Sequence, residues 1–217
     1  MFRAILFTQW KWARLALLPA AVLSFLLPIV SVQQLGAVQD GMSPGAFLEI
    51  HAGMGALYPM LSAVIALLLA SGAWAADHAG RHVYALTLPI ERGRLVLWRL
   101  GAGLSLLLLP VAALWVGCLL AAVSAPIPTG LTSYPNLLAL RFALAALVAF
   151  GLFFAVAAGT SRTAAWVLAL LAAWVLAQVL LSSVGAQVDL VGPVLDRLFT
   201  WPGPFDVFTG RWVLIDV

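Results

Sequence analysis

Two histidines and several charged side chains lie together in one polar segment, residues 77–94, which separates two long apolar stretches. His78 and His82 are four residues apart, a spacing that lets two imidazoles bind a metal ion from one face of a helix. Beyond Asp77, however, no third ligand lies beside them, and a tetrahedral site needs three or four. The pair therefore fits a solvated or partner-facing surface better, and we predict no metal-binding residue.

No motif in the chain supports catalysis in the context that the chemistry requires. An ATP-binding loop requires a Gly-Lys pair, and the single lysine, Lys11, follows Trp10. His-Glu-x-x-His does not occur. Gly-x-Ser-x-Gly occurs once, at residues 41–45 between the first two apolar stretches, where the sequence predicts no strand-to-helix turn of the kind that exposes a nucleophilic serine. No charged residue is placed deep inside an apolar stretch; Arg141 lies one turn into its stretch and is expected to extend to the membrane interface. We predict neither an enzyme nor an autonomous ion-driven carrier, so energy for any transport would come from a partner.

The composition is that of an integral membrane protein. Of its 217 residues, 64% are hydrophobic and only 9% are charged, and the mean hydropathy is +1.09. Five apolar stretches approach or exceed the roughly 18 residues that cross about 30 Å of hydrocarbon as a helix. They cover residues 15–32, 57–76, 95–123, 137–159 and 164–184. We predict an all-α bundle of five transmembrane helices that forms a single domain over residues 1–217.

Basic residues predict the orientation of this bundle, because cytoplasmic loops are enriched in them. With the N-terminus inside, the inner segments hold eight of the eleven basic residues. Segment 77–94 is then cytoplasmic. Ahead of the first span, Arg3, Lys11 and Arg14 gather on one side of a helical wheel. This pattern predicts a helix in the inner interface, although a frayed basic terminus explains it equally well.

Residues 185–217 contain too many prolines and glycines to form a span, yet they carry many aliphatic and aromatic side chains. We expect short helical pieces that re-enter the outer interface or pack against the other helices. Gln178 in the fifth stretch either bonds to a neighbouring helix or lines a substrate path. Small residues at four-residue spacing permit close contact between helices; two such pairs are Gly101 with Ser105 and Ala155 with Gly159.

Within segment 77–94 the pattern predicts a short amphipathic helix, a bend and a second helix. Ala79, Val83, Leu86 and Ile90 fall on one stripe of a helix. Pro89 then interrupts this helix and can begin the next one, which runs through the arginines into the third span. A helix, a bend and a helix are more than an orienting loop requires.

This segment resembles the cytoplasmic link of ABC-2 type permeases, the membrane subunits of ATP-binding cassette exporters. In that family an acid begins the link and a Leu-Pro-x-x-Arg element leads into the third span. This chain has Asp77 and Leu88-Pro89-Ile90-Glu91-Arg92. The amphipathic N-terminus, the short loop at 160–163 and the broken pieces after the fifth span are also similar. The family has a sixth span, so either that helix lies outside this sequence or the topology differs.

The resemblance implies a coupling mechanism. A separate cytoplasmic ATPase subunit, which binds ATP and magnesium, would dock on the link, while two permease chains, identical or related, would face each other in a bacterial inner membrane. A non-catalytic scaffold or assembly subunit of a larger membrane complex is the alternative. The docking residues implied are Asp77, Arg81, Tyr84, Leu86, Leu88, Pro89 and Arg92.

Overall fold

Five long helices dominate the protein. The computed structural model describes residues 1–36, 54–79, 91–124, 131–159, 161–183, 189 and 191–216. In this part of the chain the long helices are α1 (Phe2–Gly36), α3 (Leu57–Ala79), α5 (Arg92–Ser124), α6 (Pro135–Ala158) and α7 (Ser161–Ser183). Each coincides with one of the predicted apolar stretches and is long and apolar enough to cross a membrane. The structure thus agrees with an all-α integral membrane protein.

The sequence of these helices explains why they form. Leucine and alanine, which dominate them, are among the strongest helix formers. In an apolar solvent a helix also satisfies its own backbone groups, which favours continuous helices even through Pro19 and Pro28 in α1 and Pro110 in α5. Serine hydroxyls inside the helices donate to main-chain carbonyl groups one turn earlier, as Ser24 does to Ala20 at 2.8 Å.

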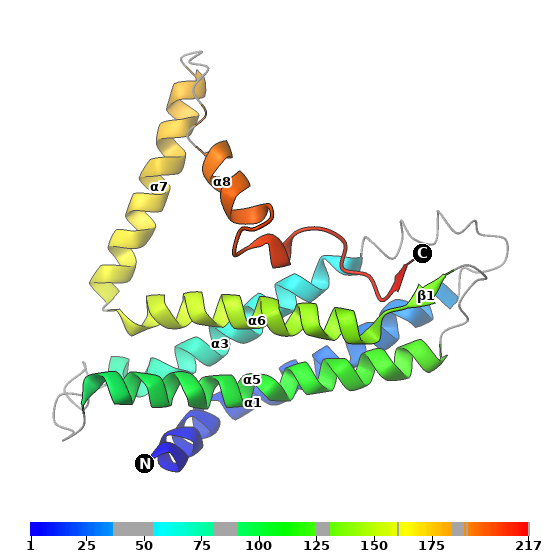
Figure 1. Ribbon diagram of the computed structural model, residues 1–217. Coiled ribbons are helices and arrows are strands. Elements are labelled where there is room, and N and C mark those ends of the chain that lie inside the picture. The colour runs from blue at the N-terminus through cyan, green and yellow to red at the C-terminus, as the bar shows by residue number, and fades with distance from the viewer. Residues whose placement is uncertain are drawn as a thin grey trace.

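Four of the helices form a bundle. α1 packs along α5 and α3 packs along α6, while α5 and α6 also lie side by side (Figure 1). Many residues at these contacts are alanines, which let helix backbones approach closely. Fully buried examples are Ala66, Ala70, Ala102, Ala121, Ala145 and Ala146.

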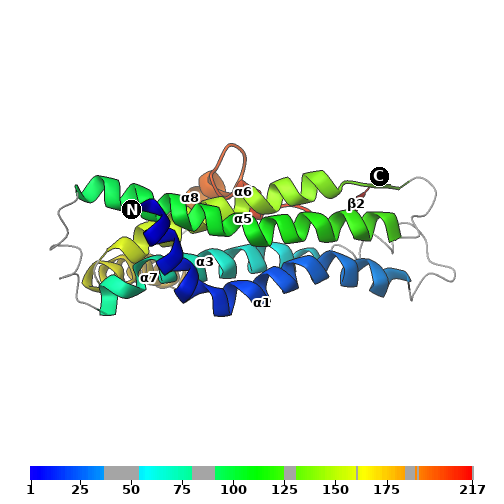
Figure 2. The same ribbon diagram turned by 90° about the horizontal axis from the view of Figure 1, so that it is seen from below.

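The first turns of α1 run in a different direction from the rest of that helix. Figure 2 shows them crossing α5 before α1 turns to run along the bundle. The chain is helical from Phe2 onward, and the Gln9 amide donates to the main-chain carbonyl oxygen of Arg99 in α5 at 3.1 Å. The structure therefore favours an ordered helix at the N-terminus over a frayed one.

After α6 the chain leaves the bundle and later returns to it. α7 extends away from α6 (Figure 1), and its most apolar 18-residue window contains no buried residue. The chain comes back through α8 (Gly192–Phe199) and a short 3-10 helix, η1 (Asp206–Phe208). It ends in strand β2 (Ile215–Asp216), which pairs antiparallel with β1 (Thr132–Ser133) and sets Ser133 opposite Ile215.

Candidate functional site

The predicted docking segment joins two helices at one end of the bundle. α3 ends there at Ala79 and α5 begins there at Arg92, next to the start of α1 (Figure 1). We call this the basic end. Asp77 lies in the last turn of α3, and Arg92 is the first residue of α5. The other predicted docking residues fall in 80–90, outside the described residues: Arg81, Tyr84, Leu86, Leu88 and Pro89.

The start of α5 carries the charges that can be described next to this segment. Glu91 and Arg94 form an ion pair at 3.5 Å, and both side chains are largely exposed. Such exposed pairs contribute little stability and can exchange partners. One and a half turns later, the guanidinium of Arg99 lies 4.7 Å from the ring centre of Trp74 on α3. The contact ties α5 to α3 near the end of α3 and the start of α5.

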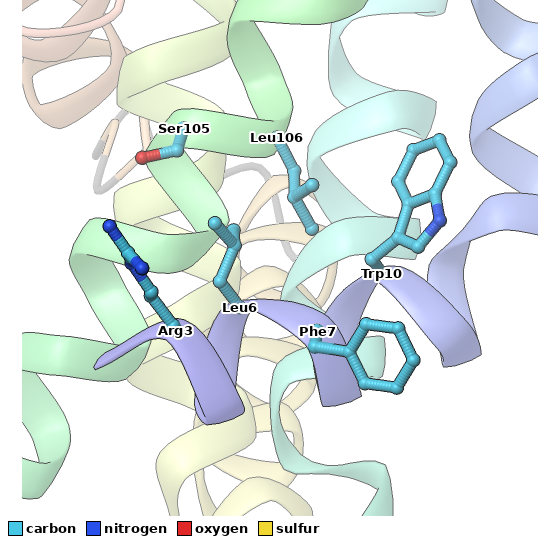
Figure 3. Close-up of a pocket in the computed structure, with 6 residues that line it drawn as sticks. All are labelled: Arg3, Leu6, Phe7, Trp10, Ser105 and Leu106. Carbon is cyan, nitrogen blue, oxygen red and sulfur yellow. The ribbon is translucent and has the colours of Figure 1, made fainter. Parts of the chain in front are cut away.

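A groove opens at the same end between the first turns of α1 and the body of α5 (Figure 3). Its volume is about 410 Å³. Figure 3 shows Arg3 beside Ser105 at one end and the ring of Trp10 at the other, with Leu6 and Leu106 between them. The groove therefore has one polar end with a positive charge and an apolar remainder.

At the opposite end of the bundle the tail, residues 200–216, returns to the helices and is bound by Arg141. Arg141 in the second turn of α6 donates from Nε to the carbonyl oxygen of Val207 at 3.2 Å and from Nη1 to that of Arg211 at 2.6 Å. Its Nη2 donates to the carbonyl oxygen of Thr209, and the guanidinium lies 4.9 Å from the ring centre of Trp212. Each guanidinium nitrogen of Arg141 thus has a main-chain partner in the tail, the segment that the sequence places at the outer interface.

Beneath Arg141, aromatic and hydroxyl groups connect the tail to two further helices. The ring of Trp212 stacks on Tyr58 of α3, with ring centres 6.3 Å apart and planes 9° from parallel. The hydroxyl groups of Tyr58 and Ser31 on α1 are hydrogen-bonded at 3.3 Å. Trp212 is only 3% exposed and Tyr58 only 1%. The end of the tail, with Trp212, Leu214 and Ile215 buried, is thus part of the protein core.

The close approach of the tail depends on two glycines. A Cβ atom at Gly55 would lie 2.6 Å from the main-chain oxygen of Trp212, so only glycine lets the tail pass there. Gly210 has a φ angle of 77°, in the region that side chains disfavour, and the turn at Gly210 brings the neighbouring carbonyl groups of Thr209 and Arg211 to Arg141.

Gln178, the other predicted site residue, lies on α7 and is half-buried. It lies neither at the basic end nor among the contacts of Arg141. Among the described residues, no group of three histidine, cysteine, aspartate or glutamate side chains is placed to hold a metal ion. Cys118 is buried.

Comparisons of the chain with models of protein families, with curated proteins and with solved structures found no match. The arguments for function therefore come from its own residues and their placement.

Proposed function

We propose that this chain is the transmembrane permease subunit of an ATP-binding cassette exporter, driven by a separate cytoplasmic ATPase subunit that binds ATP and magnesium. The observation that supports the proposal is the placement of the two flanks of segment 77–94. Its two flanks, at Asp77 and Arg92, meet at the basic end of the bundle, and its Leu-Pro-x-x-Arg element runs directly into α5.

The length and packing of α5 would let this helix transmit a movement of the docking segment through the bundle. α5 has 33 residues, which corresponds to about 50 Å of helix. It packs along α1 and against α6. A displacement applied at Leu88–Arg92 by nucleotide-driven movement of the ATPase would therefore reach the far end of the bundle through one continuous helix. Two such chains, identical or related, would enclose the substrate path between them, in a bacterial inner membrane.

Charge reversal tests this proposal. The chain and the ATPase encoded next to it are reconstituted together in vesicles, and ATP hydrolysis is measured with and without the chain. We expect Arg81→Glu and Arg92→Glu each to lower the stimulation of hydrolysis at least five-fold, because both remove a cation from the docking segment. The control is Arg197→Glu in α8, which reverses an exposed charge outside that segment.

Insertion is checked by the amount of each variant in the membrane fraction, which should match the wild type. Normal insertion with unchanged stimulation in Arg81→Glu and Arg92→Glu would contradict the docking assignment. Purification of the chain with partners that all lack a Gly-x-x-x-x-Gly-Lys-Ser/Thr sequence would favour a scaffold subunit instead.

A further inference from the structure

The groove at the basic end has the chemistry of a site for a charged amphiphile. Four of its lining residues come from α1 and two from α5. Its volume lies within the range of about 300–1,000 Å³ that is usual for small-molecule sites. Arg3 supplies a positive charge at one end, and the Ser105 hydroxyl beside it, which donates to Gly101 at 2.8 Å, can still accept a hydrogen bond. The rest of the lining is aliphatic and aromatic.

The charges around the groove select a negative headgroup. Lys11 and Arg14 are exposed on the same helix as Arg3, and Arg94 and Arg99 lie on α5. Among the acids whose side chains the structure describes, only Glu91 is at this end, and it already pairs with Arg94. An anionic group at Arg3 therefore meets the added positive potential of the exposed Lys11 and Arg14 on the same helix. A zwitterionic headgroup would gain much less from it.

The position of the groove fits a lipid at the membrane interface. The first turns of α1 cross α5 instead of running along it (Figure 2), as expected for a helix lying in the plane of the interface. Arg99 of α5 lies one and a half turns before Ser105, and Trp10 is a residue type enriched at the headgroup level. A headgroup at Arg3 would thus be at the interface, with its chain extending into the hydrocarbon.

We propose that this groove binds one anionic phospholipid, with the phosphate at Arg3 and an acyl chain along Leu6, Leu106 and Trp10. The lipid fastens the N-terminal turns of α1 to α5. This site requires only that the chain spans a membrane, and it is independent of the ATPase partner.

Native mass spectrometry of the full chain in mild detergent tests the site. The chain is incubated with equal amounts of phosphatidylglycerol and phosphatidylcholine, and the retained lipid is measured. We expect one phosphatidylglycerol to be retained at least ten-fold more than phosphatidylcholine. Arg3→Gln should abolish this preference, and Ser105→Phe, which fills the groove from an exposed position, should prevent retention of either lipid.

The matched control is Lys11→Gln, which removes one positive charge from the same helix without touching the groove. It should lower the retention of phosphatidylglycerol much less than Arg3→Gln does, because Lys11 contributes only to the surrounding field. The proposal would be overturned if the wild type retained the two lipids equally, or if Arg3→Gln kept the wild-type preference for phosphatidylglycerol. The proposal would also be overturned if Lys11→Gln lost as much phosphatidylglycerol as Arg3→Gln, because the lipid would then be attracted to the basic surface as a whole. The melting temperature of each variant shows that it is folded.

A second measurement does not depend on retention in the gas phase. In vesicles, lipids with brominated acyl chains quench the fluorescence of nearby tryptophans. The fluorescence of Trp10 is obtained by subtracting the spectrum of Trp10→Phe from that of the wild type. Brominated phosphatidylglycerol should quench Trp10 more than brominated phosphatidylcholine in the wild type. The two lipids should quench it equally in Arg3→Gln. A lipid preference that survives in Arg3→Gln would contradict the site.

Discussion

Arg141 shows how a charged side chain is accommodated inside an apolar helix of this protein. The tail at 207–211 has three carbonyl groups that no strand or helix partner satisfies, and each accepts a hydrogen bond from Arg141. An unpaired carbonyl group away from water is costly, and so is an unpaired charge. The guanidinium, with its planar array of donors, removes both costs at once. Arg141 is therefore a structural residue that fixes the tail.

We predict that Arg141→Ala destabilises the protein by about 2–4 kcal/mol, because three acceptors and the face of Trp212 lose a charged partner. Hydrogen exchange at 207–214 should become at least ten-fold faster, whereas exchange in α5 should change less. Arg141→Lys should fall between the wild type and Arg141→Ala, since an ammonium cannot reproduce the guanidinium fork.

Arg211→Ala is the control for this prediction. It removes an exposed cation from the same segment but leaves the main-chain carbonyl group that Arg141 uses. It should leave the exchange rates of the tail unchanged. Equal exchange in Arg141→Ala and the wild type would show that the tail is held by its apolar contacts alone.

At the scale of the elements, the sequence predicted the long helices well and the contacts between them poorly. Helix positions follow from the length of the apolar stretches alone. Contacts depend on which helix faces meet. The four-residue spacing of small residues pointed to Gly101 and Ser105 as a place of close helix contact, although the Ser105 side chain is exposed. The structure instead places Gly117 of α5 directly against the main chain of Phe25 in α1. In a sequence so rich in alanine and glycine, small-residue spacing occurs too often to identify the true contact.

Gly117 gives a prediction for the packing of α1 on α5. A Cβ atom at this position would collide with the carbonyl group of Phe25, a main-chain group that cannot rotate away. Gly117→Ala should therefore force the helices apart and lower the free energy of unfolding by about 1–3 kcal/mol. Thermal unfolding in detergent, followed by size-exclusion chromatography, measures the change.

Gly151→Ala in α6 is the matched substitution, because a Cβ atom there meets nothing within 4 Å. It should be neutral or stabilising by up to about 1 kcal/mol, since alanine favours the helix more than glycine does. If both glycine variants melted at the same temperature, close packing of α1 on α5 would not limit stability.

The two ends of the helix bundle differ: one carries basic side chains and the other is bound by the tail. The basic end collects the start of α1, the flanks of segment 77–94 and the lipid groove. At the other end the tail returns to the helices, and Arg141 and Trp212 hold it against α3 and α6. Sequence reasoning grouped the charges of the basic end, because basic residues gather in cytoplasmic segments. It could not foresee the contact of Arg141 with the tail, because about 70 residues separate the partners and no motif marks them.

The central claim is that segment 77–94 docks an ATPase subunit, and site-specific photocrosslinking in intact cells tests it most directly. A photoreactive phenylalanine analogue replaces Tyr84 in the segment or, as the control, Trp201 in the tail, whose side chain is 85% exposed. We predict that the probe at Tyr84 forms a covalent adduct with a protein containing a Gly-x-x-x-x-Gly-Lys-Ser/Thr sequence, and that the probe at Trp201 does not. Adducts at Tyr84 only with proteins that lack this sequence, or an ATPase adduct formed equally from Trp201, would contradict the claim.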